Sequence, residues 1–282
     1  MKNIKFIGKI HSGQDGAIYN GYLFRFGANG KCFVYDILNV SEDVEPKYTF
    51  TLDKSPNFAP HSNSVSFGVE FYETGDEFPL LYTNVYNNFA KSENDMRGCT
   101  FVYRIVKNGE KFTSKLIQII KIGFTSDTLW KSSFNDVRPY GNFVIDVKNS
   151  KYYAFTMRDE SETTNYFEFN LPKVNDGVLD ENLNVNVVTL NKSDILKSFT
   201  VEYHRYIQGA TFHNGKVYSV EGFTNDIINP AVLRVVNVKK CKQELYYNFA
   251  NNGYPIEPEF ICFYNDICYY ADNVGNLYTL EF

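Results

Sequence analysis

The stretch Ile207–Gly222, IQGATFHNGKVYSVEG, decides the fold, because other parts of the chain repeat its plan. Two runs that suit β-strands, GATFHN and KVYSVEG, meet at Asn214-Gly215. Asn-Gly is the dipeptide most favoured in a two-residue type I′ turn, which joins neighbouring antiparallel strands. The stretch therefore predicts a β-hairpin.

The same plan recurs in four other places along the chain. Close copies are QDGAIYNGYLFRFG at Gln14–Gly27 and EFICFYNDICYYAD at Glu259–Asp272. Looser copies are GNFVIDVKNSKYYAF at Gly141–Phe155 and HSNSVSFGVEF at His61–Phe71, the latter followed by the strand-like PLLYTNVY. A hairpin that recurs in this way is typical of a β-propeller, whose blades are small antiparallel sheets.

The last repeat is one strand short of four, and one strand-like run precedes the first repeat. The last repeat supplies only three strand-like runs, the third being Asn276–Phe282. Lys2–Ile10 alternates apolar and polar residues, as a half-buried strand does. A propeller ring closes when the N-terminal strand joins the last blade and covers its edge. The sequence therefore predicts an all-β, single-domain, five-bladed β-propeller over residues 1–282, closed by the N-terminal strand.

The third repeat is the least regular. After its hairpin we expect Asn165–Asn170 as the third strand and Val185–Leu190 as the outer strand of the blade. Ser193–Phe199 follows, and Ser193 is a residue type that caps helices. We therefore expect one short helical turn there.

Composition excludes several function classes. Aromatic residues make up 17% of the chain, with 22 Tyr and 25 Phe, which favours sheets. The net charge is −5 and the longest basic run is Lys239-Lys240, so we expect no nucleic-acid partner. Neither a GxxxxGK phosphate loop nor a GxSxG serine motif occurs, and we expect no cofactor.

The sequence shows no export signal and no membrane span. MKNIKFIGKI at the start lacks the apolar run of a signal peptide, and no stretch approaches the roughly 18 apolar residues of a span. Five cysteines include Cys262 and Cys268 on neighbouring predicted strands, for which buried free thiols are the expected state. We therefore expect a cytoplasmic protein, or one assembled into a particle, without a membrane partner.

Polar residues mark the entry to the first strand of each repeat. The first strand of a blade lines the central channel, so these side chains should converge at one mouth of it. Two interpretations follow: structural hydrogen bonding around a water-filled channel, or a binding site for a glycan or similar polar ligand. Aligning the hairpins places at this position Asp15, Asn63, Gln208 and Glu259, with Arg138 or Asn142 in the third repeat.

Three of the four histidines stand just before these entry positions. They are His11, His61 and His204. Three histidines on three loops could contact the ligand or, as a weaker alternative, bind a metal ion. The default is that they are surface or capping residues, and no metal is expected.

The first repeat also resembles a known family. Gln14-Asp15-Gly16 followed by AIYNGYLF resembles the first blade of five-bladed furanosidase-type glycoside hydrolases, the arabinanase and levansucrase group. The resemblance implies that Asp15 is a catalytic base or nucleophile. That family has Pro after the Asp, where this chain has Gly16.

A hydrolase also needs a second carboxylate close to the first. Glu259 belongs to the blade that neighbours Asp15 in a closed ring, while Glu221 and Asp146 lie in later repeats. If the chain is an enzyme, Asp15, Glu259 and Glu221 are the catalytic candidates, and Asp15 must lie at the bottom of an open pocket. If it is a binding module, Asp15 should accept backbone N–H groups of adjoining blades.

The sequence therefore leaves three functions open. The first is a non-catalytic recognition module for a glycan or small polar ligand at the channel mouth or in the loops above it. The second is a glycoside hydrolase centred on Asp15. The third is a structural or host-recognition component of a larger, phage-like assembly, with a protein partner.

Overall fold

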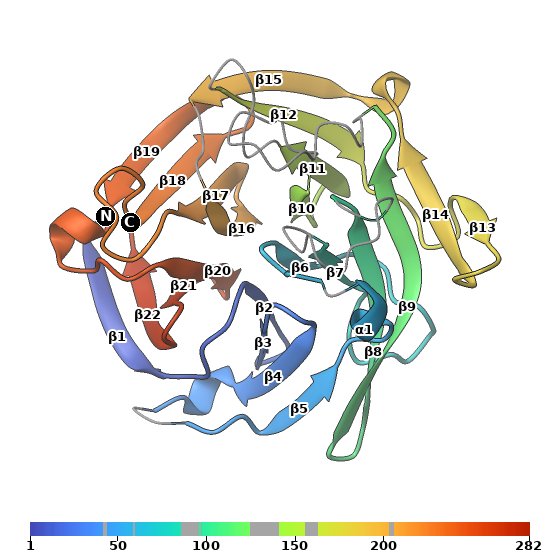
Figure 1. Ribbon diagram of the computed structural model, residues 1–282, viewed down its shortest axis with the longest axis horizontal. Coiled ribbons are helices and arrows are strands. Elements are labelled where there is room, and N and C mark those ends of the chain that lie inside the picture. Colours follow the sequence, from blue (N-terminus) through green and yellow to red (C-terminus); the bar gives the residue numbers. More distant parts are fainter. Residues whose placement is uncertain are drawn as a thin grey trace.

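In the computed structural model, the described residues are 1–41, 44–58, 60–85, 96, 98–124, 141–155, 163–202 and 206–282. Figure 1 shows their strands in five sheets that radiate from a central axis and form a closed ring. The molecule is a five-bladed β-propeller, as the repeats predict.

Each blade contains four antiparallel strands, which follow one another in order from the axis to the rim of the ring. Blade one has β2 (Gly16–Tyr19), β3 (Tyr22–Phe26), β4 (Lys31–Asp36) and β5 (Tyr48–Thr51). Blade two has β6 (Val65–Phe67), β7 (Leu81–Asn84), β8 (Thr100–Asn108) and β9 (Lys111–Ile122). Blade three has β10 (Asn142–Asp146), β11 (Lys151–Phe155), β12 (Thr163–Asn170) and β15 (Lys197–Glu202). Blade four has β16 (Ile207–His213), β17 (Lys216–Glu221), β18 (Val232–Asn237) and β19 (Lys242–Asn248).

Blade five is closed by the start of the chain. It consists of β20 (Pro258–Tyr264), β21 (Ile267–Asp272), β22 (Asn276–Glu281) and β1 (Asn3–Lys9). Strand β1 pairs antiparallel with β22 from Asn3 opposite Glu281 to Lys9 opposite Asn276, and the two ends of the chain lie side by side (Figure 1). The predicted closure is confirmed.

The innermost hairpins use the turn that their sequences predict. Asn214 and Gly215 have φ angles of 47° and 76°, and Asn20 and Gly21 have 48° and 78°. Positive φ at both central residues is the mark of a type I′ turn, which Asn and Gly adopt at least cost.

Blade three differs from the prediction at its outer edge. β14 (Val185–Leu190), expected there, instead pairs parallel with β9 of blade two and carries the short β13 (Val178–Asp180) outside it. The outer strand of blade three is β15, which overlaps the end of Ser193–Phe199, where one short helical turn was expected. Only Lys192–Asp194 forms a 3₁₀ turn, capped by Asn191 and not Ser193.

Packing explains both differences. Buried Gln118 on β9 donates from Nε2 to the carbonyl oxygens of Lys173 (2.7 Å) and Asp176 (3.1 Å), which holds the chain that leads to β14 against blade two. On β15 the apolar residues alternate, and Phe199 stacks on Tyr166 of β12 with 5.0 Å between ring centroids. Apolar residues at every second position face the same side of a strand, so this pattern suits a strand and not a helical turn.

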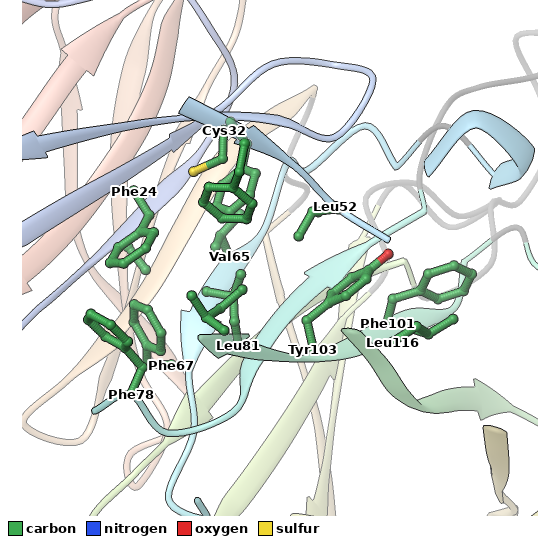
Figure 2. Close-up of a cluster of buried hydrophobic side chains, with 14 of the residues drawn as sticks. Phe24, Cys32, Leu52, Val65, Phe67, Phe78, Leu81, Phe101, Tyr103 and Leu116 are labelled. Atoms are coloured by element: carbon green, nitrogen blue, oxygen red, sulfur yellow. The ribbon is translucent and has the colours of Figure 1, made fainter. Parts of the chain in front are cut away.

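The remaining short elements are the helix α1 (Ser55–Phe58) and the 3₁₀ turns η1 (Ile37–Asn39), η4 (Lys192–Asp194) and η5 (Ala250–Asn252). The core consists of apolar clusters between neighbouring blades. Figure 2 shows the one between blades one and two, where Phe24 lies against Phe67 and Phe78 with centroids 5.2 and 5.4 Å apart. All five cysteines are free thiols, and Cys262 and Cys268 are buried as expected.

Candidate functional site

Polar side chains gather where the inner strands β2, β6, β10, β16 and β20 begin. These strands are the innermost of their blades (Figure 1). The residues at their starts are almost fully buried, with exposed fractions of 0 to 8%. They are Asp15, Asn63, Asn142, Gln208 and Glu259. All five belong to the set predicted at the channel entry.

Asp15 joins blade one to three other blades. Its Oδ2 accepts hydrogen bonds from the backbone N–H of Val65 on β6 (3.1 Å) and of Ala210 on β16 (3.3 Å). Its Oδ1 accepts from the N–H of Ile261 on β20, at 3.4 Å. Burial raises the pKa of Asp15 well above its usual range, and the backbone N–H groups and Arg25 oppose that shift. Its side chain is wholly buried.

Gly209 makes room for this arrangement. A Cβ atom there would lie 2.9 Å from the carbonyl oxygen of Glu259 and 3.1 Å from Asp15 Oδ1. Real Cβ atoms rarely come so close to other heavy atoms, so only glycine fits without displacement. The glycine of the repeat GATFHN is therefore required by the close approach of the Glu259 backbone and the Asp15 carboxylate.

Asn63 and Gln208 continue the polar contacts across the channel. Asn63 Nδ2 donates to Gln208 Oε1 at 3.2 Å, which joins blade two to blade four. Gln208 Nε2 donates to Glu257 Oε1 at 2.6 Å, and Asn273 Nδ2 donates to Glu257 Oε2 at 3.0 Å. Burial raises the pKa of Glu257, and the Asn273 amide opposes this.

A buried arginine, which sequence reasoning missed, lies beside these acids. Arg25 on β3 is fully buried, and its Nη2 donates to the carbonyl oxygens of Gly13 (2.6 Å) and Asp272 (3.2 Å). Burial raises the pKa of Glu259 well above its usual range, and the Arg25 charge opposes this. The available signal was a cationic residue inside the apolar strand YLFRF, since a buried charge needs partners.

Several polar atoms of this cluster have no hydrogen-bond partner among the residues that the structure describes. Buried polar groups are nearly always paired with protein, water or ligand. The unpaired buried atoms are Gln14 Oε1, Arg25 Nε and Nη1, Asn63 Oδ1, Glu259 Oε2, and both Oδ1 and Nδ2 of Asn142. We call these five residues, Gln14, Arg25, Asn63, Asn142 and Glu259, the polar channel cluster.

Other predicted site residues are two described histidines, His11 and His61, and two residues outside the described ranges. His11 is exposed and packs its ring against the edge of Phe33, with 4.2 Å between centroids. Burial lowers the pKa of His61 to about 4. Arg138 and His204 lie outside the described residues. The predicted convergence of His11, His61 and His204 therefore stays a prediction. Within the described ranges, no three His, Cys, Asp or Glu side chains form a group suited to a metal ion.

Glu221 and Asp146 form their side-chain contacts within their own blades. Glu221 on β17 pairs with Arg234 on β18, with Oε1 3.0 Å from Nε, and Ser219 Oγ donates to the same oxygen at 2.9 Å. Asp146 ends β10 and accepts from Asn149 Nδ2 at 2.7 Å, whereas Asn142 begins that strand. Neither carboxylate therefore faces Asp15 across a free space.

Comparison with known proteins gives similar structures only. No protein-family model matches the chain, and no curated protein matches its sequence. The propeller is similar to glutaminyl cyclase of Myxococcus xanthus, with 9% identity, a TM-score of 0.47 and coverage of 99% of this chain and 96% of that one. It is similar to exo-β-1,3-galactanase of Phanerochaete chrysosporium, solved with galactose, with 13% identity, a TM-score of 0.46 and coverage of 96% and 61%.

A further similar structure is Sqt1 of Saccharomyces cerevisiae, with 9% identity, a TM-score of 0.36 and coverage of 92% of this chain and 54% of that one. At such identities and TM-scores these similarities carry no argument about what the chain binds or does. In the described part of the chain, no helix has the length and apolar character to cross a membrane.

Proposed function

We propose that this protein is a non-catalytic recognition module that binds a small, hydroxyl-rich ligand, such as a sugar unit of a glycan, at the polar channel cluster. The observation that carries the proposal is the set of unpaired buried atoms. Each such atom lowers the stability of the folded protein by about 1–3 kcal/mol if it stays unpaired. A ligand that forms hydrogen bonds with these atoms would therefore be bound favourably.

The chemistry of those atoms favours hydroxyl groups. Gln14 Oε1, Asn63 Oδ1 and Glu259 Oε2 offer acceptor positions, while Arg25 Nε and Nη1 are donors. A hydroxyl group both donates and accepts, so one hydroxyl can satisfy an acceptor and a donor together.

Binding is better supported than hydrolysis. Glycoside hydrolysis needs two carboxylates on either side of one bond. Both oxygens of Asp15 accept backbone N–H groups of neighbouring blades, and Glu221 is bonded to Arg234. Glu259 Oε2 is the unpaired carboxylate oxygen of the cluster, which suits it to ligand binding.

Asn142 provides the sharpest test, because its buried amide makes no hydrogen bond with the described residues. The ligand would first be found on a glycan array and its affinity measured by calorimetry. Asn142→Leu keeps the size of the side chain and removes both amide atoms. We expect a loss of affinity on the order of tenfold, about 1.4 kcal/mol, with an unchanged or higher melting temperature.

Asn84 supplies the matched control. It is equally buried, but its Oδ1 accepts from the Ser64 N–H at 3.2 Å and its Nδ2 donates to the Gly141 carbonyl at 2.8 Å. Asn84→Leu should therefore lower stability, in contrast to Asn142→Leu. Unchanged affinity in Asn142→Leu, or an array without any bound glycan, would refute the proposed function.

A further inference from the structure

A second concave surface lies between blades four and five. It is a groove of about 580 Å³, lined by residues of β17, β18 and β19 and by Met1 and Phe282. It lies at the opposite end of the blade from Gln208, because Lys216 in the groove pairs with His213, the last residue of β16. The groove is therefore separate from the polar channel cluster.

Two aromatic side chains that line the groove are held in place by ring-to-ring contacts. Tyr218 and Phe282 meet edge to face, with ring centroids 5.4 Å apart. Behind them, Phe263 packs on Tyr218 at 4.7 Å and stacks on His213 at 4.0 Å. Phe282 nevertheless keeps 37% of its surface exposed, whereas Tyr218 keeps 8%. A flat apolar group can therefore pack against Phe282 without moving the rings beneath it.

The rim of the groove is positively charged although the chain as a whole is acidic. Glu244 accepts from Lys216 Nζ at 2.9 Å and from Lys240 Nζ at 2.7 Å, and these bonds lower the pKa of Glu244 to about 2. Lys242 also lines the groove and forms no ion pair with a described residue. Two lysines, Lys216 and Lys242, line the groove with one carboxylate, Glu244, so these side chains leave a positive rim in a chain of net charge −5.

We propose that this groove binds an anionic ligand with a flat aromatic body. The aromatic body packs against Phe282 and Tyr218, and the acid group lies beside Lys242. The volume falls within the range of roughly 300–1,000 Å³ that is usual for small-molecule sites, and aromatic rings with a few placed charges are their usual lining. The proposal stands independently of the channel cluster, because the two sites share no residue.

Anilinonaphthalene sulfonate is a suitable probe, because it joins an aromatic body to a single negative charge and fluoresces on binding. We expect saturable binding to the native protein at one site. Lys242→Glu should weaken it on the order of tenfold, and Phe282→Ala should weaken it similarly. Lys192→Glu, an exposed charge reversal on another blade, serves as the matched control and should leave the affinity unchanged.

A second probe separates charge from apolar contact. N-phenyl-1-naphthylamine has the same ring system without the sulfonate, so it should bind more weakly than the sulfonate and be insensitive to Lys242→Glu. Circular dichroism and melting temperature would show that each variant is folded. Equal affinity of the two probes, or unchanged sulfonate binding in both Lys242→Glu and Phe282→Ala, would overturn the proposal.

Discussion

The carboxylate of Asp15 on blade one accepts a hydrogen bond from the backbone N–H of Ala210 on blade four, 195 residues along the chain. The two blades are not neighbours in the ring, so this bond crosses the central axis. With the bonds from Val65 and Ile261, it makes one side chain a common anchor for four of the five blades.

Asp15→Asn should therefore destabilise the protein. An amide nitrogen in place of a carboxylate oxygen would point a donor at backbone N–H donors and leave at least one of them unpaired. We expect a loss of about 1–3 kcal/mol in the free energy of unfolding, measured by urea denaturation. Asp266→Asn, in an exposed turn, is the control. A variant as stable as the parent would show that these bonds do not anchor the blades.

Gly209→Ala should be destabilising for a related reason. The added methyl would lie 2.9 Å from the Glu259 carbonyl oxygen and 3.1 Å from Asp15 Oδ1. Relieving this overlap requires blades one, four and five to shift, at a cost of about 1–3 kcal/mol. Gly27→Ala is the matched control, because its nearest contact is 3.6 Å away. Similar melting temperatures for the two variants would contradict the close packing described at the axis.

Removal of residues 1–10 should open blade five. β22 would lose its partner β1 and present an unpaired sheet edge, which is a template for association with other chains. We expect aggregation or loss of a cooperative unfolding transition, observed by size-exclusion chromatography and thermal denaturation. A truncated protein that remains monomeric and melts like the parent would rule out a stabilising role for the closure.

His61 should make stability depend on pH in the acidic range. Burial lowers its pKa from the ordinary 6.5 to about 4 in the folded protein. Between those values the unfolded chain binds a proton that the folded chain does not. The contribution of neutral His61 is therefore fully present above pH 6.5 and is lost as the pH falls toward 4.

The test compares the parent with His61→Gln by urea denaturation between pH 4 and pH 7. Between pH 7 and pH 4, the free energy of unfolding of the parent should fall by about 1–3 kcal/mol more than that of His61→Gln. His11→Gln, which removes an exposed imidazole, is the control. Identical pH profiles for parent and His61→Gln would show that His61 does not carry the effect.

Local signals predicted most of the fold. Asn-Gly turns and alternating strands are read from neighbouring residues, and the hairpin at Asn214-Gly215 and the closure by β1 followed from them. The parallel pairing of β14 with β9 could not be predicted in this way. It depends on Gln118 reaching a segment more than 50 residues away, and no local pattern encodes that contact.

The site was predictable in position, whereas the role of Asp15 could be predicted only as one of two alternatives. Aligning the repeats found Asp15, Asn63, Gln208 and Glu259 because equivalent positions in a ring converge. What Asp15 does depended on its partners, which are backbone N–H groups, and every residue type except proline carries one. Arg25 was missed because a carbonyl oxygen and two acids among its partners belong to blade five, which lies beside blade one in the ring but at the other end of the sequence.

The antiparallel closure also determines how the ring would respond to mechanical force. Asn3 lies opposite Glu281, so a pull on the two ends of the chain acts first on that pair and then on each next pair along β1 and β22. Such a load breaks the bonds one after another, as in unzipping, and not all together, as in shearing. Blade five would open at low force, and the other four blades would follow from its exposed edge.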